Sequence, residues 1–163
     1  MRGKYDRHAT RAERWARQRT ALNGAVARAV ASRGEKTTVR DICAAAGVGR
    51  NTFYQHFRDI ETARRIAIDQ AGAALELTLR RLGTAREIAA IALRFATEDA
   101  VRRALLLTTT EQAEEPFSLV LERAFASKNI RAARAVALAG AALAILRRYE
   151  KEPPPAAVSA IFE

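Results

Sequence analysis

Residues 37–57 read TTVRDICAAAGVGRNTFYQHF, which predicts two short helices joined by a tight turn. Thr38 followed three residues later by Asp41 is a capping-box pattern, so a helix is expected over about 39–46. Gly47 can adopt the left-handed conformation that ends such a helix. A second short helix is expected directly after the turn.

The second helix of this stretch has one apolar side and one polar side. Phe53 and Phe57 are four residues apart, so they share a face and are expected in a core. For Tyr54, DNA contact and a half-buried place at the core edge are both open. A polar face beside a glycine-containing turn is typical of a helix that enters the major groove of DNA. The residues expected on that outward face are Arg50, Asn51, Thr52, Tyr54, Gln55 and His56.

Positive charge is concentrated in the same part of the chain. The 163 residues carry a formal net charge of +10. Residues 1–65 hold fifteen basic and six acidic side chains, a net of +9, whereas residues 66–163 hold thirteen and twelve, a net of +1. A localised positive field is typical of a phosphate-binding surface. A solvated face that only aids solubility is the alternative.

The N-terminal segment is expected to complete a three-helix unit with this stretch. Residues 1–9 are basic, and we expect either an arm that touches DNA or plain disorder. Thr10 and Glu13 form a second capping box, and Gly34 closes the helix that it starts. Trp15 is interpreted as a packing residue and not as part of a ligand cage.

The remainder of the chain reads as helical throughout. Asp59, Thr84 and Thr97 are the expected helix starts, and Gly83 is the expected residue beyond a helix end. The helices are predicted at about 59–82, 84–96, 97–112, 116–126 and 130–150, and residues 156–163 either add about two turns or fray. No strand alternation is present, so the fold is predicted to be all-α.

Two domains are expected from this order of elements. A three-helix DNA-binding helix-turn-helix domain is expected at residues 1–57 and a helical bundle at residues 58–163. The middle of the last long helix, residues 135–146, is rich in alanine and apolar nearly all round. Such a helix is expected to be buried or paired with another helix.

Several function classes lack support in the sequence. The single cysteine, Cys43, allows no intramolecular disulfide and is consistent with a reducing cytoplasm. It is interpreted as a small buried residue, with a redox sensor as the alternative. No apolar run has the length of a membrane span or the form of a signal peptide. We find no metal-ligand cluster, phosphate loop or nucleophile elbow, so no enzyme, metal or cofactor is predicted.

Residues about 22–63 resemble the N-terminal DNA-binding domain of TetR/AcrR-type transcriptional regulators. The resemblance covers about a quarter of the chain by motif, and the rest matches in architecture only. It is carried, in the order and spacing of that family, by Thr38-Val39-Arg40-Asp41-Ile42, Ala46-Gly47-Val48, Thr52-Phe53-Tyr54 and His56-Phe57.

The resemblance implies a homodimer that binds a palindromic operator in double-stranded DNA, usually as a repressor that a small molecule releases. Phosphate contacts would come from Thr38, Thr52, Tyr54 and His56, with Arg40 in the same DNA-binding set. Base edges would lie nearest Arg50, Asn51 and Gln55, because arginine suits guanine and the amides suit adenine. For His56, local capping is open beside phosphate contact, and a metal-ligand role is not expected.

The chain departs from the family pattern at three places. Gly49 stands where serine is frequent and is a weaker N-cap. Ile60 replaces a phosphate-binding lysine, a role that Arg58 or Arg64 could take over. The C-terminal domain is short, so the helix Ile130–Glu150 is expected to supply most of the dimer contact.

An effector cavity in the second domain is expected with the same weight as an ordinary bundle core. The candidate lining residues are Phe95, Leu106, Thr109, Phe117 and Phe125, together with Thr108, Thr110 and Glu111. The alternative function is an architectural or protein-interaction DNA-binding protein of the same fold without an effector. An enzyme such as a recombinase fragment is a third class, and the missing catalytic residues argue against it.

Overall fold

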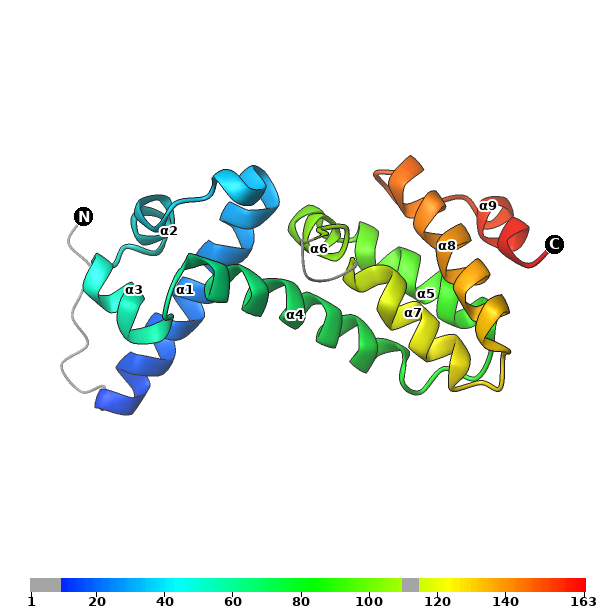
Figure 1. Cartoon of the computed structure of the whole chain (residues 1–163), viewed down its shortest axis with the longest axis horizontal. Coiled ribbons are helices and arrows are strands. Elements are labelled where there is room, and N and C mark those ends of the chain that lie inside the picture. The colour runs from blue at the N-terminus through cyan, green and yellow to red at the C-terminus, as the bar shows by residue number, and fades with distance from the viewer. Residues whose placement is uncertain (1–9, 110–114) are drawn as a thin grey trace. The chain divides into compact units, whose positions relative to one another are not determined.

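The structure is a computed structural model that describes residues 10–109 and 115–163. Within these residues it contains nine α-helices, two short 3-10 helices and no strand, which confirms the all-α prediction (Figure 1). Contacts divide the chain into an N-terminal unit, Met1–Arg64, and a C-terminal unit, Arg65–Glu163. The expected basic arm, residues 1–9, lies outside the described residues.

Helix α1 (Arg11–Arg33) forms the long element of the N-terminal unit. Its capping box is present, because the Glu13 amide donates to the Thr10 hydroxyl at 3.2 Å and the Thr10 amide donates to the Glu13 carboxylate at 2.7 Å. Gly34 ends the helix with a φ of 54°. The apolar stripe of α1 that enters the core consists of Leu22, Ala25, Val26 and Val30.

Helices α2 (Val39–Ala46) and α3 (Arg50–His56) form the predicted helix-turn-helix pair. The Asp41 amide donates to the Thr38 hydroxyl at 3.3 Å, as the capping-box pattern predicts. Gly47 has a φ of 66°, the left-handed conformation expected at the end of α2. Gly49 is the N-cap of α3 and provides no side-chain hydrogen bond.

The first turn of α4 (Ile60–Leu79) belongs to the N-terminal unit, so the division of the chain falls inside this helix and later than the expected 57/58 boundary. Arg64 explains the shift. Its guanidinium donates to the Thr37 carbonyl at 3.1 Å and to the Glu35 carbonyl, and therefore ties α4 to the loop before α2. The start of α4 is as expected, since the Thr62 amide donates to the Asp59 carboxylate at 2.7 Å.

The C-terminal unit is a helical bundle in which α5 touches four other helices. Helix α5 contacts α6, α7, α8 and α9, and α7 lies along α8 (Figure 1). The fully buried leucine and isoleucine side chains of this unit include Leu75, Ile88, Leu93, Leu121 and Leu146. The elements after α4 are α5 (Ala85–Thr97), α6 (Ala100–Leu106), α7 (Pro116–Ala126), α8 (Ala132–Arg148), α9 (Pro155–Ser159) and a 3-10 turn (Ala160–Phe162).

The predicted start of α6 is wrong. Thr97 does not begin a helix but ends α5, and its hydroxyl donates back to the Leu93 carbonyl at 2.8 Å. Asp99 is the cap of α6, because its carboxylate accepts from the Arg102 amide at 2.8 Å. Helix α6 ends at Leu106, and the predicted end at Gln112 lies outside the described residues.

The predicted end of α4 is also wrong. The helix stops at Leu79, and Gly83 does not adopt the left-handed conformation expected of a residue beyond a helix end. Its amide instead donates to the Glu87 carboxylate at 3.2 Å, which also accepts from the Thr84 amide at 3.0 Å. Gly83 therefore serves the start of α5, where the capping box of Thr84 and Glu87 is as predicted.

The turn between α2 and α3 offers a matched test with one substitution at two glycines. A Cβ at Gly47 or Gly49 would meet no atom within 4 Å, but only Gly47 has a positive φ. Gly47→Ser is expected to lower the free energy of unfolding by about 1 kcal/mol through backbone strain. Gly49→Ser is expected to raise it by a few tenths of a kcal/mol by adding a capping hydroxyl. Denaturant unfolding of both variants measures this, and equal effects at the two positions would contradict the assigned turn.

Candidate nucleic-acid interface

Helix α3 presents a continuous polar face to solvent. Arg50, Asn51, Tyr54 and Gln55 are exposed, with Tyr54 at 55% of its full accessibility. Phe53 on the opposite side is fully buried and touches the Tyr54 ring edge-on at a centroid distance of 5.3 Å. This contact positions the tyrosine ring while more than half of the residue stays exposed. Thr52, also expected outward, is only partly exposed at the side of this face.

The start of α2 carries two further expected DNA contacts, Thr38 and Arg40, and both are exposed. The Thr38 hydroxyl already donates to the Asp41 carboxylate at 2.7 Å. This hydrogen bond, followed by the Arg33 guanidinium 2.9 Å away, holds the pKa of Asp41 below its usual value. A phosphate at this helix start would therefore share the hydroxyl with a carboxylate, and the exposed Arg40 can receive the phosphate as well.

The expectation that His56 lies on the outward surface is wrong. Its side chain is buried, with 8% exposure, and neither ring nitrogen has a hydrogen-bond partner. The Trp15 indole of α1 covers the imidazole at a centroid distance of 3.9 Å. Arg19 donates to the His56 carbonyl at 2.6 Å. Because α1 closes over the last turn of α3, the imidazole can reach a phosphate only by leaving this stack.

The sequence left Arg58 and Arg64 open as substitutes for the missing lysine, and the structure separates them. Arg64 is committed to the Glu35 and Thr37 carbonyls, and its side chain is only 13% exposed. The Arg58 side chain is 90% exposed and lies 3.7 Å from the Asp59 carboxylate. Arg58 is therefore the one of the two that is presented to solvent.

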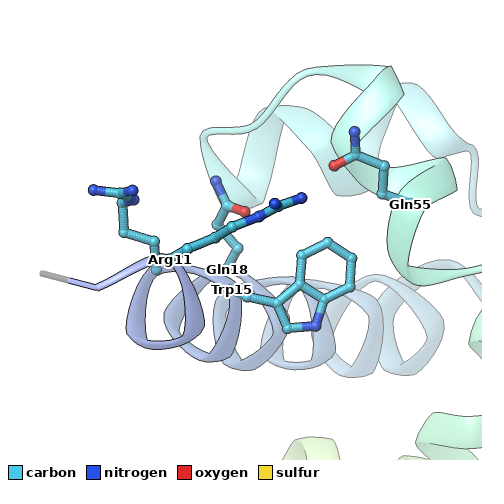
Figure 2. A pocket seen from close by; sticks show the side chains of 5 residues that line it. Arg11, Trp15, Gln18 and Gln55 are labelled. Atoms are coloured by element: carbon cyan, nitrogen blue, oxygen red, sulfur yellow. The ribbon is translucent and has the colours of Figure 1, made fainter.

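A hollow of about 450 Å³ adjoins the exposed face of α3. We call it the α1/α3 hollow, and it is lined by Arg11, Arg14, Trp15, Gln18 and Gln55. Figure 2 shows Arg11, Trp15 and Gln18 on α1 and Gln55 on α3. The hollow is not among the features expected from the sequence, in which Trp15 reads as a packing residue. The available signal was the spacing of residues 11, 14, 15 and 18, which places basic, aromatic and amide side chains on one helical face.

The candidate effector residues do not share one accessible cavity wall. Leu106, Phe117 and Phe125 are fully buried in the core of the C-terminal unit. Phe95 is half-buried beneath Arg102, whose guanidinium lies 4.1 Å from the ring centroid. Thr109 is exposed beside residues 110–114, which lie outside the described residues and include the candidates Thr110 and Glu111.

A different hollow, of about 310 Å³, opens between α5 and α9. It is lined by Arg86, Ala90, Glu152, Pro153, Pro155, Val158 and Ser159. None of the candidate effector residues takes part in it.

Residues 10–109 and 115–163 contain no group of three or more histidine, cysteine or acidic side chains arranged to hold a metal ion. None of the helices that the structure describes combines the length and apolarity of a membrane-spanning segment. Cys43 is buried without a disulfide partner, and burial raises the pKa of its thiol.

Comparison with known proteins agrees with the fold and the DNA-binding element. Residues 25–62 match the sequence model of the family described as bacterial regulatory proteins, tetR family. No curated protein matches the chain in sequence. At the structural level, the chain is similar to a TetR-like transcriptional regulator from Rhodococcus sp. RHA1, with 19% identity, 94% of each chain covered and a TM-score of 0.68.

Two further solved structures show the same fold. A TetR-family regulator from Streptomyces coelicolor A3 has 17% identity, covers 94% of this chain and 93% of its own, and gives a TM-score of 0.59. A gamma-butyrolactone receptor described as ArpA-like has 20% identity, covers 91% and 86%, and gives a TM-score of 0.58. The resemblance of residues about 22–63 to TetR-type regulators is thereby confirmed.

The buried imidazole predicts a pH dependence of stability. Burial, and then the nearby Arg19 charge, lower the pKa of His56 below its usual value of 6.5. The unfolded chain therefore takes up a proton first as the pH falls, so stability is full above about 6.5 and declines below it. Urea unfolding between about pH 7 and pH 5 should show this decline, and the window lies above the range of ordinary carboxylates.

The control for this prediction is the other histidine. His56→Phe keeps a flat ring in the stack but cannot be protonated, so its stability should change less over the same window. His8→Gln should retain the dependence of the wild-type protein. A wild-type profile that coincides with that of His56→Phe would contradict the assigned burial.

Proposed function

We propose that this chain, which has the fold and the helix-turn-helix domain of TetR-type transcriptional regulators, binds a palindromic operator as a homodimer and acts as a repressor released by a small molecule. The observation that carries the proposal is the exposed polar face of α3. Such a face suits the major groove because its donors and acceptors can pair with base edges. A bacterial regulator of this kind acts in the cytoplasm, where its DNA is.

Each exposed residue has a role that its chemistry supports. Arg50 can bond two acceptors of one guanine, and Asn51 and Gln55 can each bond an adenine in the same two-point manner. Tyr54 and Thr52 have hydroxyls suited to phosphate oxygens. Thr38, Arg40 and Arg58 add contacts to the backbone on either side. His56 is assigned the different role of holding the end of α3 against α1.

The homodimer is proposed to form through α8. Over residues 133–144 one exposed side of this helix carries small or apolar residues, with Val136 at 54% exposure, while Arg134 beside this stretch and Arg147 and Arg148 beyond it are also exposed. The other members of this α8 face are Ala133, Ala137, Gly140 and Ala144. A small-residue face allows the same helix of a second copy to approach closely. The two α3 helices of a dimer would then need to meet successive major grooves about 34–36 Å apart.

The second half of the proposal is release by an effector. One structurally similar protein is described as a gamma-butyrolactone receptor, and this likeness of fold is the comparison that supports an effector. In this chain Phe95, Leu106, Thr109, Phe117 and Phe125 remain the proposed effector residues. The full burial of Leu106, Phe117 and Phe125 favours the second candidate function, a DNA-binding protein of the same fold without an effector. Soaking the free protein with small-molecule pools and measuring thermal shifts separates the two.

The DNA-binding proposal is tested by selecting bound duplexes from a random pool. Enrichment of an inverted repeat supports a two-fold symmetric dimer that binds a specific sequence. Retention of all sequences with equal affinity would contradict a specific operator.

Two substitutions on α3 should separate positioning from specificity. Asn51→Ala is expected to cost about 1–3 kcal/mol on the selected duplex and to relax preference at one base pair. Tyr54→Ala is expected to weaken binding to selected and random duplexes by a similar factor, because a phosphate contact carries no sequence information. Fluorescence anisotropy of labelled duplexes measures both. The assignment fails if both variants change specificity alike.

The dimer surface has its own matched pair of variants. Val136→Glu places a charge on the α8 face and is expected to shift the protein toward monomer by tenfold or more, roughly 1.4 kcal/mol or above. Leu77→Glu is the control, since Leu77 is 69% exposed on α4 and is not part of that face. Sedimentation velocity measures the mass of each. A dimer that survives Val136→Glu but dissociates with Leu77→Glu would move the interface to α4.

A further inference from the structure

The α1/α3 hollow lies beside the proposed base-reading face and shares only Gln55 with it. Four of its five lining residues belong to the first two turns of α1, namely Arg11, Arg14, Trp15 and Gln18. The fifth, Gln55, sits at the edge of the exposed face of α3 (Figure 2). The hollow therefore connects the end of the α3 face with the start of α1.

The floor of the hollow is held in place by buried contacts. The indole of Trp15 rests on the buried imidazole of His56 at 3.9 Å, yet 46% of the tryptophan stays exposed. Arg19, one turn further along α1, donates to the His56 carbonyl and lies 4.7 Å from the Phe57 ring centroid. These contacts hold α1 against the last turn of α3. The two helices that line the hollow therefore keep their positions relative to each other.

The chemistry of the lining matches a sugar-phosphate chain. The Arg11 and Arg14 guanidinium groups donate in the fork geometry that phosphate oxygens accept. The amides of Gln18 and Gln55 can donate to phosphate or accept from water. The flat exposed indole offers an apolar surface of the kind that a deoxyribose can cover. The first turns of α1 carry basic side chains at 11, 14, 17 and 19 against one acidic side chain, Glu13.

We propose that the α1/α3 hollow binds a sugar-phosphate segment of the duplex whose major groove receives α3. This inference rests on the proposed DNA-binding function and adds α1 to the elements that contact DNA. Arg11 and Arg14 bind the phosphodiester, and Trp15 packs against the adjoining deoxyribose. Gln55 marks the border between base contacts and backbone contacts. The partner is the backbone of double-stranded DNA, selected by charge and shape and independent of sequence.

Trp15 is the only tryptophan of the chain, so its fluorescence reports on the hollow directly. The experiment titrates the full-length protein with a fluorescein-labelled random-sequence duplex and follows binding by anisotropy. At saturation with the unlabelled duplex, acrylamide quenching of Trp15 is measured and should fall at least twofold from that of the free protein. Bound duplex with unchanged quenching would overturn the inference while leaving the proposed function standing. If the anisotropy does not change when the duplex is added, both the inference about the hollow and the proposed DNA-binding function are contradicted.

A charge variant tests the phosphate contact separately. Arg11→Gln should reduce the slope of log affinity against log salt by about 0.9, so that between roughly 50 and 200 mM salt its affinity falls about three- to fourfold less than that of the wild type. Arg28→Gln is the control, because this substitution removes the same charge from the same helix. Arg28 is exposed and lies about 25 Å further along α1. If the two variants have equal slopes of log affinity against log salt, Arg11 contributes only to the overall positive charge and makes no contact with a phosphate in the hollow.

Neutral phosphates locate the contact on the DNA. In a duplex selected by the wild-type protein, single methylphosphonate substitutions remove one backbone charge at a time. The effect of Arg11→Gln should vanish when one particular phosphate is neutralised and persist for the others. An effect that is independent of the substituted position would overturn the assignment, and thermal melts confirm that the variant is folded.

Discussion

The burial of Phe53 determines how α3 is displayed, and the proposed DNA-binding surface depends on it. A helix of seven residues has two turns, so fixing one side chain in a core fixes the direction of the others. Phe53 and Phe57 are buried and touch at a centroid distance of 5.2 Å. Arg50, Asn51 and Tyr54 are consequently turned to solvent. The left-handed turn at Gly47 delivers the chain to this position without strain.

The buried phenylalanines hold α3 along one side only. Contacts with α1 hold its last turn as well. Trp15 covers His56, and Arg19 binds the carbonyl of the same residue. The imidazole nitrogens are left unpartnered, which costs free energy for the neutral ring and costs more once the ring is protonated. The buried position of the His56 imidazole and its protonation state are therefore linked. The same contacts shape the α1/α3 hollow, so one set of interactions supports both the base-reading face and the adjoining surface.

Much of this arrangement was predictable because it depends on local signals. The capping boxes at Thr10, Thr38 and Thr84 and the left-handed Gly47 were identified correctly from spacing alone. The predictions that failed involve either two neighbouring residues that could both cap a helix or contacts between residues far apart in the sequence. Thr97 and Asp99 are both residue types that can cap a helix, and in the structure Asp99 accepts from the Arg102 amide whereas the Thr97 hydroxyl donates back to the Leu93 carbonyl. The stack of Trp15 on His56 joins residues 41 positions apart, which no local pattern reveals. The effector candidates share apolar character with core residues, so composition could not separate a cavity from a packed bundle.

The central claim is that the outward side of α3 is where this protein meets DNA. Amide chemical-shift mapping of the isotope-labelled protein with a selected duplex tests it most directly. The account predicts that the largest changes fall at Arg50, Asn51, Tyr54 and Gln55. If a duplex binds while these amides stay unchanged and the largest shifts lie in residues 65–163, the account is wrong.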